Sequence, residues 1–258
     1  RPVGETIFVR NISLEAKKQP DKAQICGIVG HADLLSENVS SILEKHLEEG
    51  QGLFKGIRHA GGWDHHDEID NSHHHPQKNL YLSDKFSEGL NELENNDLSF
   101  EAWQYHHQIK QVTLLAKEHP NLKIVLNHFS GPLGIGPYRG KQNEIFEIWK
   151  KDIDELAKNQ NVYAKLGGLA MPINGYEVHK QAMPPSSDQL IEEQKKYYEF
   201  SIKSFGPERC MFESNFPVDK QSISYRTIWN AFKKMAKEFS QGDKDYLFME
   251  SADNFYSL

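Results

Sequence analysis

Short apolar runs recur along the chain, and each is followed by a polar loop and then by a stretch with helical periodicity. The runs are rich in β-branched and aromatic residues, which is typical of parallel strands covered on both faces. They predict six strands, at 24–31, 53–59, 98–103, 122–128, 161–168 and 209–214. Six helices are predicted at 36–49, 83–95, 105–119, 142–159, 187–205 and 221–239. Strict alternation predicts a parallel α/β sheet, either doubly wound or closed into a barrel.

The first 23 residues contain no convincing strand. Residues 6–10 are a weak strand candidate, and 11–22 are predicted to form a short helix and a loop. A (β/α)8 barrel needs eight strands. Six strands therefore leave two alternatives, an open α/β sheet or a barrel whose two opening units are absent from this chain.

The composition of the chain argues against some classes of binding partner and location. The formal net charge of −7 over 258 residues gives no basic field, so nucleic acid and anionic membranes are not expected partners. We expect no membrane span, because the apolar runs are too short. The two cysteines, Cys26 and Cys210, lie in apolar runs, which predicts reduced, buried thiols in a cytoplasmic protein.

Polar side chains stand at the carboxyl ends of five of the six predicted strands. They are His31; Arg58 and His59; Trp103, with His106 close behind; Asn127 and His128; and Glu213, with Asn215 close behind. One such histidine is readily explained as a hydrogen-bonded cap, but four strand ends with histidine nearby favour a shared polar site, because parallel strands converge there. The fifth strand ends in Gly167 and Gly168, which predicts close backbone approach.

The residue types at these ends suit acid–base or metal chemistry. Imidazoles and carboxylates can hold a divalent metal that activates water, or can exchange protons directly. Arg58 is predicted either to clamp a substrate carboxylate or to pair with a neighbouring acid. If a proton acceptor exists, Glu213, Asp219 or His128 must supply it. No nucleophile elbow, P-loop or dinucleotide fingerprint is present.

Two long loops, 60–79 and 129–141, are predicted to be functional lids or disordered segments. The first contains two histidine clusters, 65–66 and 73–75, among several acids. Their spacing is not that of a structural zinc site. A solvated loop, or adventitious metal affinity, is therefore favoured over a dedicated site.

Six stretches together resemble amidohydrolase family 2, a group of metal-dependent hydrolases with the TIM-barrel fold. They are GIVGHADL (27–34), FKGIRHAGGWD (54–64), LSFEAWQYHHQ (98–108), IVLNHFSGPLGIGPYRG (124–140), VYAKLGGLAMPINGY (162–176) and FGPERCMFESNFPVDK (205–220). The resemblance implies a (β/α)8 barrel of amidohydrolase type whose first two strands are absent from this chain. Residues 1–258 would then form one barrel domain that is incomplete at its N-terminus.

The resemblance also implies roles for individual residues. His128 matches a histidine that serves as metal ligand or catalytic group, so one divalent metal, zinc, is expected there. The last-strand position is usually an aspartate, and here it is Asn215. An amide oxygen can coordinate a metal but cannot accept a proton at neutral pH. The family's opening His-x-His pair has no counterpart before His31. Both departures weaken the expectation of a tight metal site.

The predicted function is hydrolysis of a lactone or similar cyclic ester of a carboxylated small molecule by activated water. Catalysis is assigned to His128, Asn215 and Asp219. Substrate binding is assigned to His31, Arg58, His59, Trp103 and His106. Two alternatives stay open, a metal-dependent decarboxylase of an aromatic acid and a non-catalytic ligand-binding barrel that has lost its metal. Besides a small-molecule substrate, self-association into a homo-oligomer is left open.

Overall fold

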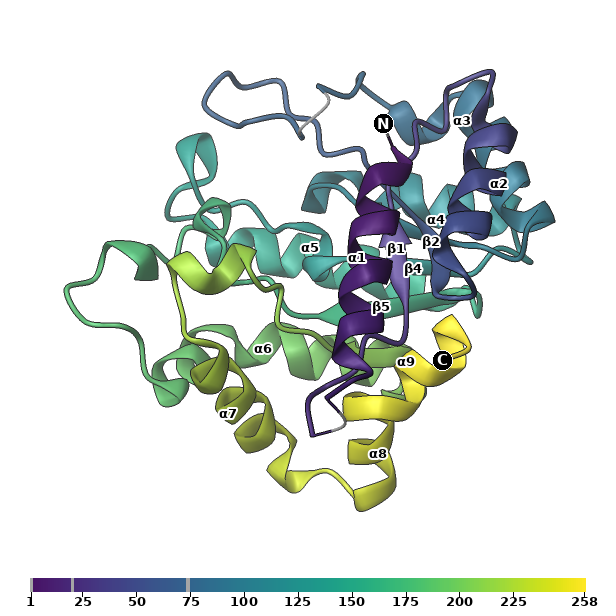
Figure 1. Ribbon diagram of the computed structural model, residues 1–258. Coiled ribbons are helices and arrows are strands. Elements are labelled where there is room, and N and C mark those ends of the chain that lie inside the picture. The colour runs from purple at the N-terminus through teal and green to yellow at the C-terminus, as the bar shows by residue number, and fades with distance from the viewer. Residues whose placement is uncertain (1, 20, 73–74) are drawn as a thin grey trace.

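The computed structural model describes residues 2–19, 21–72 and 75–258, and its centre is a curved parallel sheet (Figure 1). The strands of the described part are β1 (Ile28–Gly30), β2 (Phe54–Ala60), β3 (Ser99–Trp103), β4 (Ile124–Leu126), β5 (Val162–Leu166) and β6 (Cys210–Phe212). Each strand pairs in parallel with the next one along the chain. The six predicted strands and their parallel arrangement are confirmed, although most are shorter than predicted.

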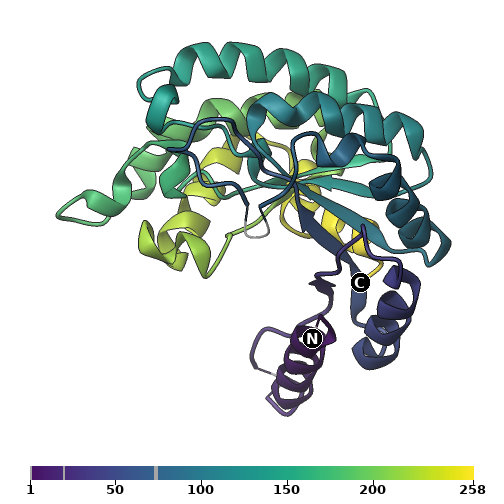
Figure 2. The ribbon, with the colours of Figure 1, turned by 90° about the horizontal axis from the view of Figure 1, so that it is seen from above.

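The described helices are α1 (Val3–Ala16), α2 (Val39–Gly50), α3 (Asp84–Asn95), α4 (Ile109–Glu118), α5 (Gln142–Ala157), α6 (Ser187–Phe205), α7 (Tyr225–Met235), α8 (Gln241–Asp245) and α9 (Ser251–Tyr256). Helices α2 to α7 each follow one strand and form an arc around the outside of the sheet, whereas α1 precedes β1 (Figure 2). The six predicted helices are confirmed as α2 to α7. Helix α6 begins where predicted, because the Ser186 side chain accepts a hydrogen bond from the Gln189 N–H.

Two predictions, one about residues 6–10 and one about Cys26, are wrong, and two helices near the C-terminus are not predicted. Residues 6–10 are not a strand but part of α1, whose buried Thr6 hydroxyl lies 2.8 Å from Nδ1 of His46 on α2. Helices α8 and α9, joined by a π-helical turn at Tyr246–Glu250, were not predicted. Cys26 is exposed rather than buried, because it precedes β1 instead of lying in it; Cys210 is buried as expected.

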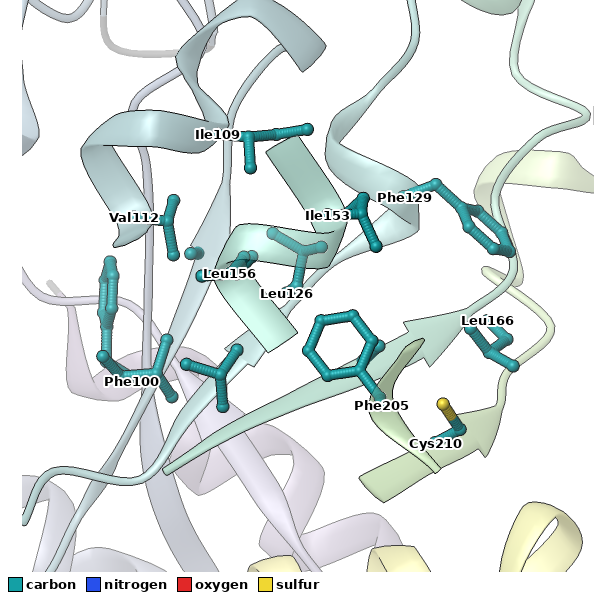
Figure 3. Close-up of a cluster of buried hydrophobic side chains, with 14 of the residues drawn as sticks. Phe100, Ile109, Val112, Leu126, Phe129, Ile153, Leu156, Leu166, Phe205 and Cys210 are labelled. Atoms are coloured by element: carbon teal, nitrogen blue, oxygen red, sulfur yellow. The ribbon is translucent and has the colours of Figure 1, made fainter. Parts of the chain in front are cut away.

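The main hydrophobic core lies between the outer face of the sheet and the helices (Figure 3). Alternate strand residues such as Phe100, Leu126 and Leu166 point outward and are fully buried. They pack against helix residues such as Ile109 and Ile153. Neighbouring residues of a strand point to opposite faces, so the positions between these outward residues face the inside of the sheet.

Helix α9 packs against the inner face of the sheet. Phe255 packs with Val125 and Met211 in a small separate cluster. Beside it, the Lys165 ammonium lies 2.6 Å from the buried Glu101 carboxylate, which also accepts a hydrogen bond from the Tyr256 hydroxyl. The last helix is therefore held to the middle of the sheet by both apolar and polar contacts.

Strands β1 and β6 form the two edges of the sheet and do not pair with each other in the described part of the chain. A cavity of about 370 Å³ lies between them. Its lining comprises Gly27, Val29, Lys165, Met211, Phe212, Glu213, Ala252, Tyr256 and Leu258. Among the described helices, we find none with the length and apolarity that a membrane span requires.

Candidate active site

Arg58, His128 and Glu213 form a connected chain across the carboxyl ends of β2, β4 and β6. Nη2 of Arg58 lies 2.8 Å from Nε2 of His128. On the other side of the ring, Nδ1 of His128 lies 2.5 Å from Oε1 of Glu213. A guanidinium only donates hydrogen bonds, so Nε2 accepts and Nδ1 carries the proton that faces the carboxylate. The arrangement fixes the tautomer of His128 from both sides.

The backbone around His128 is unusual, because His128, Phe129 and Ser130 all have positive φ angles of 50° to 58°. Non-glycine residues rarely adopt this conformation, and such strain is found where surrounding contacts enforce it. The Trp149 indole N–H donates to the Phe129 carbonyl at 2.7 Å, and the Gln104 amide donates to the Ser130 hydroxyl at 2.7 Å. These buried contacts hold the turn that directs His128 inward.

The two glycines after β5 make room for the site, as predicted from the sequence. A Cβ on Gly168, whose φ is +83°, would lie 2.7 Å from Nδ1 of His128. A Cβ on Gly167 would lie 2.0 Å from the Glu213 carbonyl oxygen. Only glycine allows the β5 loop to approach both catalytic candidates this closely.

Glu213 connects the histidine to Asn215 and Asp219. Burial alone would raise the pKa of Glu213, but the neighbouring His128 and the Lys165 charge lower it to about 2. The Asn215 backbone N–H donates to the second oxygen of Glu213 at 3.0 Å. The Asn215 side-chain amide donates to Oδ1 of Asp219 at 2.8 Å. The sequence predicts Glu213 only as one possible proton acceptor. Its position two residues after the inward-facing Met211 is the signal that it also faces inward.

Asp219 is the one acid of this group that is not held in its charged form. Its side chain is buried, and burial, together with the nearby Glu213 charge, raises the pKa to about 7. The hydrogen bond from Asn215 opposes this effect without cancelling it. Asp219 can therefore change its protonation state near neutral pH.

The residues assigned to substrate binding do not all lie beside the Arg58–His128–Glu213 chain. Trp103 joins the chain, with its ring 5.2 Å from that of His128 and 5.9 Å from the Arg58 guanidinium carbon. His31 lies close by, with Nδ1 3.1 Å from the Arg58 carbonyl oxygen. His59 points to the opposite face of β2, because neighbouring strand residues alternate, and it packs against Phe86.

His106 belongs to a separate group beside the loop that follows β2. Its Nδ1 accepts a hydrogen bond from the Leu133 N–H, and its ring packs against Tyr138. Burial lowers the pKa of His106 to about 3, so the ring is neutral at physiological pH. His106 therefore lines the loops rather than the Arg58–His128–Glu213 chain.

His128 as arranged does not suit a metal. A guanidinium cation lies at Nε2 and the proton-bearing Nδ1 faces Glu213, so neither ring nitrogen is available to a cation. Among residues 2–19, 21–72 and 75–258, three ligand atoms of the types that hold metals converge only at Asp64, His65 and His66. The assignment of a metal to His128 remains a prediction.

Comparison with known proteins identifies the family. A family model described as amidohydrolase matches residues 17–258. The chain belongs to the amidohydrolase family. This amidohydrolase is 32% identical over 258 residues to an uncharacterized protein, y4mH, of Sinorhizobium fredii, a match that covers 100% of the chain and 76% of the relative. It is 24% identical over 241 residues to an L-fucono-1,5-lactonase of Burkholderia multivorans, covering 92% of the chain and 73% of the lactonase.

Solved structures confirm the fold of this amidohydrolase. A Burkholderia multivorans amidohydrolase with bound HEPES gives a TM-score of 0.74 at 21% identity, covering 96% of this chain and 79% of that one. A crystal structure of a Burkholderia multivorans amidohydrolase with bound zinc gives a TM-score of 0.72 at 21% identity. This match covers 96% of this chain and 78% of that one. The predicted α/β class is thereby confirmed, and the six-stranded sheet is part of an amidohydrolase-type barrel.

Proposed function

We propose that this amidohydrolase hydrolyses a lactone, or a similar cyclic ester, that carries a carboxylate. The observation that carries the proposal is the Arg58–His128–Glu213 chain, which combines an anion-binding group with a histidine held in one tautomer. The similarity to a protein named as an L-fucono-1,5-lactonase supports the choice of a cyclic ester. The substrate's ring would lie against Trp103 at the end of β3.

Binding of the substrate would activate His128. In its absence, Arg58 donates to Nε2 of His128 and blocks this nitrogen. A substrate carboxylate matches the planar guanidinium and would draw Arg58 into a bidentate pair. Nε2 would then be free to accept a proton from water, and the Glu213 carboxylate would stabilise the imidazolium that forms.

The remaining steps need no other proton carrier. The water oxygen bonds to the lactone carbonyl carbon as its proton moves to Nε2 of His128. The ring C–O bond then breaks, and the same proton passes to the departing alkoxide to give a hydroxy acid. A divalent metal, which the family resemblance implies, has no part in these steps, because Nδ1 of His128 faces Glu213 and Nε2 carries the transferred proton.

The other predicted residues have supporting roles in this proposal. Asn215 donates its amide to Asp219, so its carbonyl oxygen is directed away from Asp219 and can accept a hydrogen bond from water or substrate. We retain His31 and His106 as proposed residues of the pocket rim and His59 as a support for the strand that carries Arg58. One domain and a cytoplasmic location, which suits two free cysteines, also remain proposals.

A panel of lactones, half of them carboxylated and half neutral, tests the proposal. We expect turnover that favours the carboxylated members, is undiminished by a chelator and is lost in His128→Gln. The exposed His75→Gln, which lies outside the proposed site, serves as the control substitution. Release of CO₂ from aromatic acids without lactone hydrolysis would support the decarboxylase instead, and no turnover with or without added Zn²⁺ would support a ligand-binding protein.

A further inference from the structure

A second group of polar side chains surrounds Asp64 in the loop that follows β2. The Asp64 side chain has no exposed surface, and three imidazoles approach its carboxylate. Nδ1 of His66 lies 2.8 Å and Nδ1 of His65 lies 3.7 Å from Oδ1, while Nε2 of His107 lies 3.6 Å from Oδ2. None of the residues of the Arg58–His128–Glu213 chain takes part.

In the described part of the chain, the buried carboxylate has no permanently charged partner. Both of its oxygens accept hydrogen bonds, Oδ1 from the His66 backbone N–H at 2.9 Å and Oδ2 from the Tyr138 hydroxyl at 2.6 Å. Among the described residues, the ion-pair partners of Asp64 are histidines; no lysine or arginine lies within ion-pair distance. A buried charge of this kind is costly unless a cation compensates it.

The three nearest ligand atoms already have the spacing of a metal site. Oδ1 of Asp64 and the Nδ1 atoms of His65 and His66 all lie within 4.8 Å of one another. A tetrahedral zinc with bonds of about 2.1 Å separates its ligands by about 3.4 Å. The observed 2.8 and 3.7 Å bracket that separation, so small side-chain rotations suffice.

We propose that Asp64, His65 and His66 bind one divalent transition-metal ion of the zinc type in the loop after β2. Two imidazoles and one carboxylate are the ligand types that such ions prefer. His65 is 66% exposed and His66 37%, so the outer side of the ion remains open to water or a further ligand.

The surroundings of Asp64 hold it as metal ligands are commonly held. The Tyr138 hydroxyl donates to Oδ2 at 2.6 Å, which leaves Oδ1 directed at the two histidines. The Asp64 backbone N–H donates to the Asn71 side chain at 2.7 Å, which fixes the loop itself. Such outer contacts set ligand orientation, and their loss commonly weakens metal binding by about 10- to 100-fold. The bound ion would connect the loop after β2 with Tyr138 in the loop after β4.

Metal titration of the intact chain tests this site without reference to activity. After chelation and dialysis, Zn²⁺ binding is measured by calorimetry and Co²⁺ binding by visible absorption, which reports nitrogen and oxygen ligation. We expect one tight equivalent, a loss of about 100-fold or more in Asp64→Asn and about 10-fold in Tyr138→Phe. Because Asp64→Asn changes a buried residue, His65→Gln, which alters an exposed ligand, provides a second variant that should fold normally.

The run of histidines at 73–75 in the same loop requires its own control. The triple variant H73Q/H74Q/H75Q should retain the tight equivalent. Loss of that equivalent in the triple variant, or equal Zn²⁺ binding by the wild type, Asp64→Asn and His65→Gln, would overturn the proposal and leave only adventitious binding by the loop.

Discussion

Oε1 of Glu213 lies 2.5 Å from Nδ1 of His128, although the two residues follow different strands. The carboxylate fixes the tautomer that leaves Nε2 as the nitrogen able to accept a proton. Glu213→Gln should therefore reduce kcat by about 100-fold or more, because the amide cannot stabilise an imidazolium. Steady-state kinetics on the best lactone of the panel would measure this. The exposed Glu208→Gln, near the start of β6, should leave kcat unchanged; equal effects of the two variants would contradict the assignment.

Arg58 is expected to bind the substrate's carboxylate through its planar fork. Arg58→Lys keeps the positive charge but loses the bidentate geometry, so KM for carboxylated lactones should rise by about 10-fold or more. Neutral lactones should show a much smaller change in KM. The exposed Arg226→Lys is the matched control, and a similar rise for charged and neutral substrates would argue against carboxylate recognition.

Asp219 should make the protein less stable as pH rises towards neutral. Its pKa is raised from an ordinary value of 3.8 to about 7, so the folded state holds a proton that the unfolded state has released. The free energy of unfolding should therefore fall between pH 4 and 7, by a few kcal/mol in order of magnitude. Asp219→Asn can still accept the Asn215 hydrogen bond and should remove this decrease. Urea denaturation at several pH values measures it, and an unchanged slope in the variant would refute the assignment.

Gly168 offers a test of the close approach to His128. Gly168→Ala should lower both stability and kcat, because its Cβ would lie 2.7 Å from the His128 ring. Gly140→Ala has a similar backbone, with φ of +76° against +83°, but its Cβ would meet no atom within 4 Å. The control should show only the backbone penalty of about 1–2 kcal/mol. Thermal unfolding and kcat for both variants would reveal whether Gly168→Ala carries the additional loss.

Trp149 is expected to support the strained turn after β4. Trp149→Phe removes the indole N–H that donates to the Phe129 carbonyl, leaving a buried acceptor unpaired. The cost should be about 1–3 kcal/mol, with a lower kcat as His128 loses its position. Trp229→Phe is a suitable control, since the Trp229 indole nitrogen has no hydrogen-bond partner among the described residues. Equal loss of kcat in both variants would indicate a general packing effect.

The sequence predicts most of the central fold because each strand and helix carries its own periodic signal. Helix α1 was missed since Thr6, Ile7 and Val9 favour a strand locally, whereas the observed helix places Thr6 against His46 of α2. Helix α9 was missed because its role depends on contacts with distant strands, such as the one between Tyr256 and Glu101.

The sequence predicts only those residues of the site that stand at the carboxyl ends of the strands. Parallel strands bring Arg58, His128 and Glu213 to one edge, and the alternation of side chains separates His59 from Arg58. The positive φ angles at 128–130 and the meeting of Asp64 with Tyr138 depend on loop conformations that have no periodic pattern in the sequence.

The cavity between β1 and β6 has a consequence for the chemistry at His128. Glu213 lines this cavity and also contacts His128 through Oε1. Anything apolar that filled the space would remove water from the carboxylate and raise its pKa. A Glu213 without its negative charge would lose the ion pair with His128. The cavity and the ion pair with His128 thus meet in one side chain, that of Glu213.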